Sequence, residues 1–313
     1  MTEDIRPVVV SVPTQELAAD IQPLPDGVEL LVWAMDSPAP RAHIDLVVPP
    51  YMSAARLLDA LNGVSTGLVQ SQSIGYDAVA EFLPPGTLFA NASSVHETST
   101  AELAVALTLA AQRCLPEFVR SQSEQRWAPI FADSLADRRV LLLGYGGVGK
   151  AIAARLQPFE VDLVPVASRA RDQDGVHVHG VDELAELLPT VQIVITSLPG
   201  GPTTRHIIDA AFLAALPDGA LVVNVGRGSL IDTDALVAES GRLRAAVDVC
   251  DPEPLPANHP LWHQPGVLIV PHVGGATSAM RPRIARLVRE QISRMRTGRH
   301  PVNIVLGGRE GGQ

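Results

Sequence analysis

A glycine-rich loop lies near the middle of the chain, between an apolar strand-like segment and a helical one. It runs from Gly144 to Gly149 and reads GYGGVG. The first glycine permits a tight turn, Gly146 lets the backbone approach a pyrophosphate, and the last lets the helix pack closely on the strand. The phosphates would lie against free N–H groups at the positive end of the helix dipole. The alternative is a structural turn that is merely rich in glycine, but the flanking strand and helix favour a dinucleotide site.

The residues about 20 positions after this loop bear on the choice between NAD and NADP. An Asp or Glu there would hydrogen-bond the adenosine ribose and repel a 2′-phosphate. This chain instead has Ser168 and Arg169, with Arg171 close by. A hydroxyl and a guanidinium suit a phosphate, which arginine can bind through two parallel hydrogen bonds. The pair favours NADP; the alternative is that Arg169 stacks on the adenine ring and NAD is used.

Three further motifs each follow a strand-like segment, where a doubly wound sheet places its ligands. They read NVGRG from Asn224, DVCDPEP from Asp248 and PHVGG from Pro271. Each has an ordinary interpretation when it is taken alone. Arg227 could be a surface cation, Glu253 a solvated loop charge and His272 a structural histidine.

Together, in this order after a dinucleotide loop, the three motifs resemble those of the D-2-hydroxyacid dehydrogenase family. The resemblance covers most of the chain, and it is specific because many independent matches stand in register. The other matching segments are Gly75-Tyr76-Asp77, Thr100-Ala101-Glu102, Trp127, Leu198-Pro199, Thr204-Arg205-His206 and His259-Pro260-Leu261.

The resemblance implies hydride transfer between a nicotinamide dinucleotide and a small 2-oxo or 2-hydroxy acid. His272 would be the acid/base, because imidazole exchanges protons near neutral pH. Glu253 would bond its other ring nitrogen, fix the tautomer and stabilise the imidazolium. Arg227 would bind the substrate carboxylate and polarise the carbonyl.

The loop and the resemblance together imply the binding residues. For the cofactor they are Thr100, Gly144, Gly146, Gly147, Val148, Gly149, Ser168, Arg169, Leu198, Pro199, Thr204, Val225, Gly226, Asp248, His272, Gly274 and Gly275. For the substrate they are Tyr51, Ile74, Gly75, Arg227 and His272. Asp248 and the backbone around Val225 would orient the nicotinamide amide, and the N–H groups of Ile74 and Gly75 would complete the carboxylate site. No metal site is expected, and His96, His177, His179 and His263 are interpreted as structural or surface residues.

Two departures from the family bear on the chemistry. Cys250 stands where the family usually has an aromatic residue, and with no adjoining base it is interpreted as a small apolar filler. The loop from Val48 to Met52 matches a place where phosphoglycerate-specific relatives carry arginines, and here it offers only Tyr and Met. This favours a small acid without a phosphate, such as glyoxylate or hydroxypyruvate.

Other functions remain open at this point. A phosphite-type dehydrogenase shares the architecture and the triad, and a phosphoglycerate dehydrogenase-like enzyme is a further alternative. Formate enzymes usually carry glutamine where this chain keeps Glu253. A non-enzymatic alternative is a nucleotide-sensing protein like the family's corepressors, some of which retain the triad. Measured turnover would separate an enzyme from a sensor.

The elements that must position these residues alternate between strands and helices. Strands are predicted at 8–12, 29–33, 44–48, 67–70, 140–143, 161–167, 193–197, 221–225, 245–249 and 267–270. Helices are predicted at 53–61, 99–115, 147–156, 181–188, 210–216 and 282–295, with a polar segment from 116 to about 137 and a fraying tail. The alternation predicts an α/β protein with two Rossmann or flavodoxin-like domains on parallel sheets. Residues 1–98 and 284–313 would form a discontinuous substrate domain and 99–283 the NAD(P)-binding domain, with the active site in the cleft between them.

Composition narrows the partners and the compartment. The 313 residues are 46% hydrophobic, enough for two cores. The net charge of −10 disfavours nucleic acid and anionic membranes as partners. Two cysteines exclude a disulfide framework, while the polar N-terminus and the lack of a long apolar run predict a cytoplasmic protein. The resemblance further implies that the protein is a homodimer, with an interface formed by the segment after Ser99.

Overall fold

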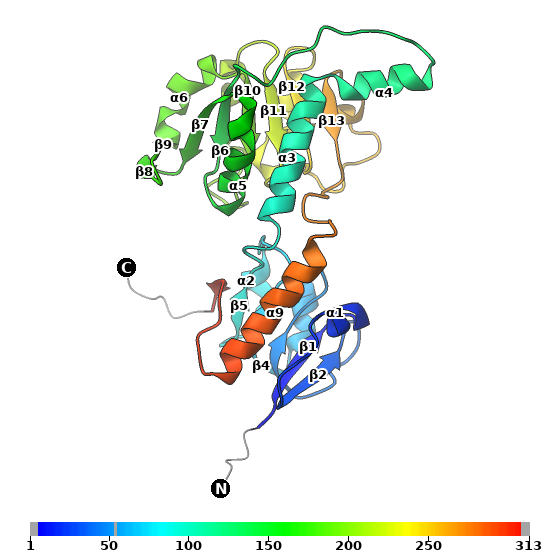
Figure 1. Cartoon of the computed structure of the whole chain (residues 1–313), viewed down its shortest axis with the longest axis vertical. Coiled ribbons are helices and arrows are strands. Elements are labelled where there is room, and N and C mark those ends of the chain that lie inside the picture. Colours follow the sequence, from blue (N-terminus) through cyan, green and yellow to red (C-terminus); the bar gives the residue numbers. More distant parts are fainter. Residues whose placement is uncertain (1–5, 53–54, 308–313) are drawn as a thin grey trace. The chain divides into compact units, whose positions relative to one another are not determined.

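The computed structural model describes residues 6–52 and 55–307, and the chain divides into two compact units (Figure 1). The first unit combines Met1–His96 with Ser278–Gln313, and the second is Glu97–Thr277. The chain therefore passes from one unit to the other at 96/97 and at 277/278. The position 283/284, where the sequence analysis divides the chain, falls inside a helix of the first unit.

The sheet of the first unit has the order β14-β5-β4-β3-β1-β2. Its strands, among the described residues, are β1 Val8–Val12, β2 Val28–Val32, β3 His43–Val47, β4 Ser65–Gln70, β5 Leu88–Ala90 and β14 Ile304–Leu306. Neighbours pair in parallel except for β14, which runs antiparallel to β5 at the edge. The first five strands follow the flavodoxin-like order 2-1-3-4-5. The helices are α1 Gln15–Asp20, α2 Val79–Phe82 and α9 Met280–Arg296, with a 3-10 turn η1 at Ala55–Leu61.

Helix α9 returns from the far end of the sequence to cover this sheet. Apolar residues at helical spacing, including Ile284, Val288 and Ile292, are buried in one cluster with strand residues such as Val10 and Leu46. A polar contact fixes the helix. The fully buried Gln291 donates from Nε2 to Gln70 Oε1 at 2.7 Å and to the Val302 carbonyl at 2.9 Å.

The sheet of the second unit has the order β13-β12-β11-β10-β6-β7-β9-β8. Its strands are β6 Arg139–Leu143, β7 Asp162–Ala167, β8 Arg171–Gln173, β9 Val176–Gly180, β10 Ile193–Thr196, β11 Leu221–Asn224, β12 Arg244–Val247 and β13 Val267–Ile269. All pairs are parallel except β8 with β9. The order reverses between β6 and β10, which is the point where doubly wound sheets bind dinucleotides. The α/β architecture expected from the sequence is confirmed, with an antiparallel strand added at one edge of each sheet.

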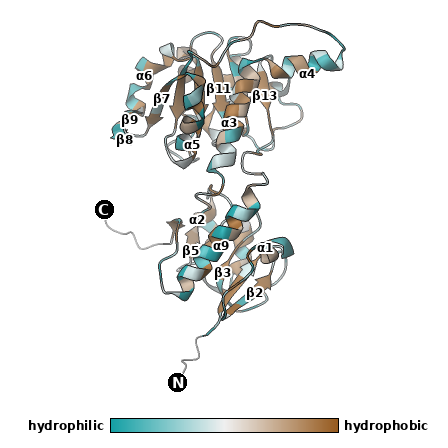
Figure 2. Cartoon of the chain, in the orientation of Figure 1, coloured by the Kyte–Doolittle hydropathy of each residue, from teal (hydrophilic) through white to brown (hydrophobic). Residues whose placement is uncertain are grey.

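Helices cover both faces of this second sheet, and Figure 2 shows that its strands are apolar. Strands β10 and β11 are buried along their whole length, as expected for a parallel sheet covered on both faces. The helices are α3 Glu97–Gln112, α4 Leu115–Ser123, α5 Gly147–Leu156, α6 Leu184–Leu187, α7 Ala210–Ala215 and α8 Thr233–Ala238. The 3-10 turns are η2 Gln157–Phe159, η3 Val181–Glu183, η4 Leu188–Thr190, η5 Gly228–Leu230 and η6 Pro260–His263.

Three helix predictions are wrong in part, and the one at 181–188 is α-helical only in α6, between the 3-10 turns η3 and η4. The single helix expected at 99–115 ends as α3 at Gln112, and α4 begins after Cys114, which has a left-handed φ of 54°. Pro116 in the first turn of α4 starts the new helix, because proline needs no hydrogen-bond acceptor there. The helix expected at 53–61 is a 3-10 turn over Ala55–Leu61, and positions 53 and 54 lie outside the described residues. No helix in the described ranges is both long and apolar enough to cross a bilayer.

Candidate functional site

The predicted cofactor residues of the second unit follow the carboxyl ends of neighbouring strands. The glycine loop follows β6, Ser168 follows β7 and Leu198 lies beyond β10. Gly226 and Asp248 come just after β11 and β12, and His272 comes after β13. Because these strands are parallel, their carboxyl ends share one edge of the sheet.

The glycine loop has the geometry that a bound pyrophosphate needs. A Cβ atom added at Gly149 would lie 2.0 Å from the Gly144 carbonyl oxygen, so only glycine permits this packing. A Cβ at Gly146 would meet nothing within 4 Å, so the space beside that backbone is open to a ligand. Helix α5 begins directly there, and the N–H groups of its first turn have no acceptor within the helix. The loop therefore fits an anion held by backbone donors.

Leu198 joins three strand ends at this edge. A Cβ atom added at Gly144 would lie 3.2 Å from the Leu198 Cδ2 atom. A Cβ atom added at Gly226 would lie 2.6 Å from the Leu198 carbonyl oxygen. A residue that sequence analysis missed lies on the other side of the loop: the Glu97 side chain comes within 3.2 Å of the Cβ position of Gly147. Glu97 opens α3 one turn before Thr100, and its type and spacing alone give no signal of this contact.

Ser168 and Arg169 are exposed where β7 ends. The Arg171 guanidinium donates to the Arg169 carbonyl at 3.4 Å and to Gln173 Oε1 at 3.1 Å, which holds the start of the β8–β9 hairpin. The hydroxyl and the guanidinium at 168 and 169 are therefore accessible at the strand end that selects the cofactor.

The turn that carries Arg227 is shaped by the buried Asn224. Its Oδ1 accepts from the Gly226 N–H at 3.0 Å, and its Nδ2 donates to the Arg227 carbonyl at 2.8 Å. Asn224 ends an otherwise apolar strand, a signal to which the sequence analysis assigned no role. Gly228 allows this turn to pack closely against the next loop, because a Cβ atom at position 228 would lie 1.8 Å from the Cys250 carbonyl oxygen.

His272 and Glu253 form a hydrogen-bonded pair, which is an ion pair when the ring is protonated. Nδ1 of His272 lies 2.6 Å from Oε1 of Glu253, and the two side chains are 33% and 41% exposed. This hydrogen bond raises the pKa of His272; burial opposes the shift, and the positive charge of Arg227 opposes it further. Since a carboxylate only accepts, Nδ1 is the donor and Nε2 is left as the atom that can exchange a proton.

Asp248 holds the loop that carries this histidine. Its Oδ1 accepts from the Val273 N–H at 2.6 Å and its Oδ2 from the Gly274 N–H at 3.0 Å. Its own carbonyl accepts from the His272 N–H at 2.7 Å. Burial raises the pKa of Asp248, while the two N–H donors act in the opposite direction. The Asp248 side chain therefore has a structural role, in addition to the contact with the cofactor that the sequence predicts.

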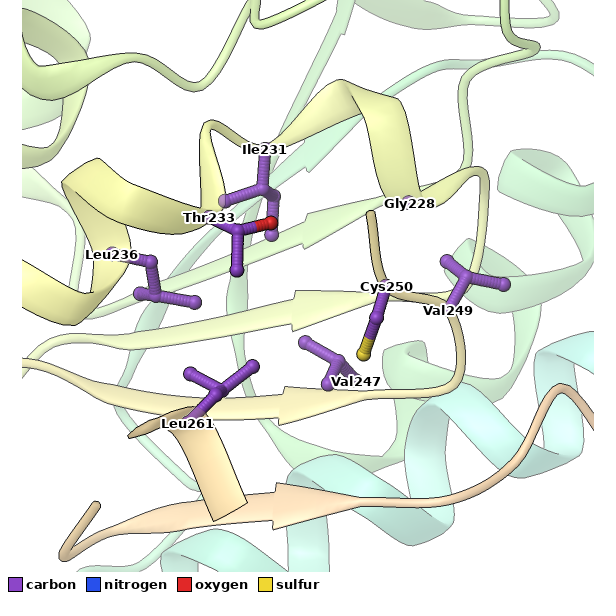
Figure 3. A pocket seen from close by; sticks show the side chains of 8 residues that line it. All are labelled: Gly228, Ile231, Thr233, Leu236, Val247, Val249, Cys250 and Leu261. Carbon is purple, nitrogen blue, oxygen red and sulfur yellow. The ribbon is translucent and has the colours of Figure 1, made fainter. Parts of the chain in front are cut away.

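Cys250 faces an apolar pocket beneath these loops. Figure 3 shows its sulfur directed toward Val247. The pocket is lined by Gly228, Ile231, Thr233, Leu236, Val247, Val249, Cys250 and Leu261. Burial raises the pKa of the thiol to about 11. A thiol with that pKa stays protonated near neutral pH and is a poor nucleophile, in agreement with its interpretation as a filler.

The predicted substrate residues of the first unit follow β3 and β4. Tyr51 stacks on His96, with ring centroids 5.6 Å apart, and His96 Nε2 donates to the Gln72 carbonyl at 2.6 Å. Ile74 accepts from Asn91 Nδ2 at 2.9 Å through its carbonyl. Among the described residues, no group accepts from the backbone N–H of Ile74 or Gly75. Both can donate to an anionic ligand.

Comparison with known proteins gives consistent matches. The model of a family described as D-isomer specific 2-hydroxyacid dehydrogenase, NAD binding domain, matches residues 105–274. The chain is 30% identical over 278 residues to the glyoxylate reductase/hydroxypyruvate reductase of Mus musculus, covering 81% of this chain and 83% of the mouse protein. It is also similar to the D-isomer specific 2-hydroxyacid dehydrogenase of Xanthobacter autotrophicus Py2 solved with NADPH and MES, at 27% identity and a TM-score of 0.81, over 96% of this chain and 98% of that one. An NADPH-dependent glyoxylate/hydroxypyruvate reductase of Sinorhizobium meliloti, solved with NADP and malonate, matches at 26% identity and a TM-score of 0.78, over 96% and 97%.

Proposed function

The chain belongs to the D-isomer specific 2-hydroxyacid dehydrogenase family, and from that premise we propose that it reduces a small 2-oxo acid with NADPH. The family is one of NAD(P)-dependent oxidoreductases, and this chain is such an enzyme.

The observation that carries the proposal is the 2.6 Å bond between His272 and Glu253, on the loops next to the Arg227 turn. In the direction of reduction, protonated His272 donates from Nε2 to the substrate oxygen, and Glu253 stabilises the imidazolium before the transfer. Arg227 binds the substrate carboxylate and polarises the carbonyl, with its turn held by Asn224. Asp248 keeps the histidine loop in place through its two backbone bonds.

The dinucleotide, when bound, supplies the hydride that reduces the 2-oxo carbon. The glycine loop and the first turn of α5 would hold its pyrophosphate through backbone N–H groups. We assign the NADP preference to the exposed Ser168 and Arg169, because a guanidinium and a hydroxyl are good partners for a 2′-phosphate. In support, the similar structures from Xanthobacter and Sinorhizobium contain NADPH and NADP.

For the substrate we propose a small acid such as glyoxylate or hydroxypyruvate. The backbone N–H groups of Ile74 and Gly75 would donate to its carboxylate, and Tyr51 would contact its other end. The curated relatives support this class, since several are named glyoxylate or hydroxypyruvate reductases.

We also propose that the enzyme is a homodimer. The segment from α4 to position 131 exposes apolar side chains that a monomer would leave in water, with Trp127 99% and Phe131 107% exposed. Leu115 and Val119 on α4 and Ile130 add to this apolar surface. Apolar surface of this kind marks interaction sites.

The test is oxidation of NADPH and of NADH with a panel of 2-oxo acids, with His272→Gln as the paired variant. We expect turnover with glyoxylate or hydroxypyruvate, a higher kcat/KM with NADPH, and a loss of about 10²- to 10⁴-fold in kcat for His272→Gln. Absence of turnover with every acid, or full activity of the variant, would refute the mechanism.

A further inference from the structure

A cluster of metal-ligating side chains lies on the β8–β9 hairpin of the second unit. We propose that His177, His179 and Glu183 bind a divalent transition-metal ion such as Zn²⁺. One ligand atom from each of the three residues lies within 4.8 Å of the other two. This assignment replaces the interpretation of the two histidines as surface residues, and it does not depend on the proposed activity.

Strand geometry places both imidazoles on one face. His177 and His179 are two positions apart in β9, and alternate residues of a strand point to the same side. Val178 between them is fully buried, so the two rings lie on the outer face. Their centroids are 4.7 Å apart, with the ring planes perpendicular. The two imidazoles therefore lie side by side, and imidazole nitrogen is one of the ligands that bind Zn²⁺ in proteins.

Glu183 is folded back toward this face by the turn η3 that follows β9. Its Oε1 accepts from the Gly180 N–H at 2.7 Å, and its Oε2 accepts from Nδ1 of His179 at 2.7 Å. The turn therefore holds the carboxylate beside the two imidazoles.

Carboxylates also fix which ring nitrogens face a metal. His177 Nδ1 lies 2.9 Å from Asp172 Oδ1, on the neighbouring strand β8. A carboxylate only accepts, so Nδ1 of His177 is the donor and Nε2 of its neutral ring keeps the lone pair that can bind an ion. Nδ1 of His179 lies 2.7 Å from Glu183 Oε2, so an ion bound by these two atoms would replace the proton that they share. Natural metal sites often orient a histidine as Asp172 orients His177, with a carboxylate on the nitrogen that does not bind the ion.

The size of the cluster suits a transition metal after small side-chain rotations. Tetrahedral Zn²⁺ with ligands at about 2.0–2.1 Å sets ligand atoms about 3.4 Å apart, so the donors need to approach by at most about 1.4 Å. The His177 and His179 side chains are 56% and 26% exposed and have room to rotate. Imidazole and carboxylate together suit Zn²⁺, Ni²⁺ or Cu²⁺, with water in the remaining positions.

The test is calorimetric titration of the untagged, chelator-treated, cofactor-free protein with ZnCl₂. We expect wild type to bind one Zn²⁺ ion that the His177→Gln/His179→Gln double variant does not bind, and Glu183→Gln to weaken binding at least tenfold. Matched controls are the exposed His263→Gln and Glu186→Gln, which should bind as wild type does. His272→Gln should also keep this ion, which separates the hairpin from the His272–Glu253 pair.

Thermal unfolding and Co²⁺ absorption provide independent readouts. Saturating Zn²⁺ should raise the unfolding midpoint of wild type but not of the double variant, because a ligand that binds only the folded state stabilises it. The visible bands of bound Co²⁺ should change in each single histidine variant, so the test stands even if the double variant fails to fold. If wild type binds no Zn²⁺, or the folded double variant binds it with the same Kd, the proposal is wrong.

Discussion

Replacing Glu253 with Gln tests whether the carboxylate acts through its charge. Glutamine can keep a hydrogen bond to Nδ1 of His272 but cannot balance the charge of the imidazolium. A hydrogen bond to a charged partner contributes about 1.5–3 kcal/mol and a neutral one about 0.5–1.5 kcal/mol, so the substitution removes about 1–1.5 kcal/mol. The side chains are 33% and 41% exposed, and solvent screening reduces this to about 1 kcal/mol. We therefore expect kcat for reduction, measured at a pH above the pKa of His272, to fall about fivefold.

The same substitution should change the pH profile in a definite direction. Glu253 raises the pKa of His272, and reduction needs the protonated ring, so the wild-type rate is high below that pKa and falls as pH rises through it. Without the carboxylate the fall should occur at lower pH, and in the oxidation direction the rise should also move to lower pH.

The assay is steady-state NADPH oxidation across the pH range, for wild type, Glu253→Gln and Glu253→Ala. In the alanine variant His272 loses both the charge that stabilises it and the hydrogen bond that orients its ring. This variant should therefore be slower than the glutamine variant, with a loss that approaches the about 10²-fold effect of removing general acid catalysis. A glutamine variant with the wild-type rate and an unmoved pH profile would refute the assigned role of Glu253.

Four further variants test the cofactor site and the assembly. Gly149→Ala would bring a Cβ to 2.0 Å from the Gly144 carbonyl oxygen and should cost about 1–3 kcal/mol of unfolding free energy, seen as a lower thermal midpoint. Gly146→Ala, at φ −87° with open space beside it, should keep stability within about 0.5 kcal/mol yet raise the KM for NADPH; equal stability of the two variants would contradict the packing argument. Ser168→Asp with Arg169→Ala should shift the kcat/KM ratio toward NADH, and an unchanged ratio would rule out their role in cofactor choice. Trp127→Ser with Phe131→Ser should shift sedimentation from dimer to monomer, and a wild-type sedimentation coefficient for the variant would exclude this surface as the interface.

The sequence predicts the elements best where burial on both faces dictates a continuous apolar run. Strand β1 and helix α5 begin and end at the predicted residues, and β10 and β11 differ by a single position. Short strands near a sheet edge are harder to predict, because β8 has only charged and polar residues and β9 shows only a short alternation of Val and His. The break at Cys114 was missed because the residues on both sides are good helix formers.

In the site, too, contacts set by the local sequence can be predicted, and contacts between distant segments cannot. The glycine loop and the His272–Glu253 pair are read from motifs, since a strand and its following turn determine their geometry. The contacts of Leu198 with Gly144 and Gly226, and of Glu97 with Gly147, depend on which strands and helices are neighbours in space. Nothing in the local sequence encodes that order, so these contacts become visible only in the folded sheet.

The return of α9 to the first sheet sets an order of events during synthesis. Residues 97–277 are contiguous, so the second unit can fold as soon as they have left the ribosome. The first sheet must wait, because Ile284, Val288 and Ile292 cover its apolar face and Gln291 satisfies the buried Gln70. The N-terminal strands, although made first, are thus completed last. A nascent chain that stops before α9 would hold a folded second unit beside an uncovered apolar sheet, a species that chaperones would have to shield.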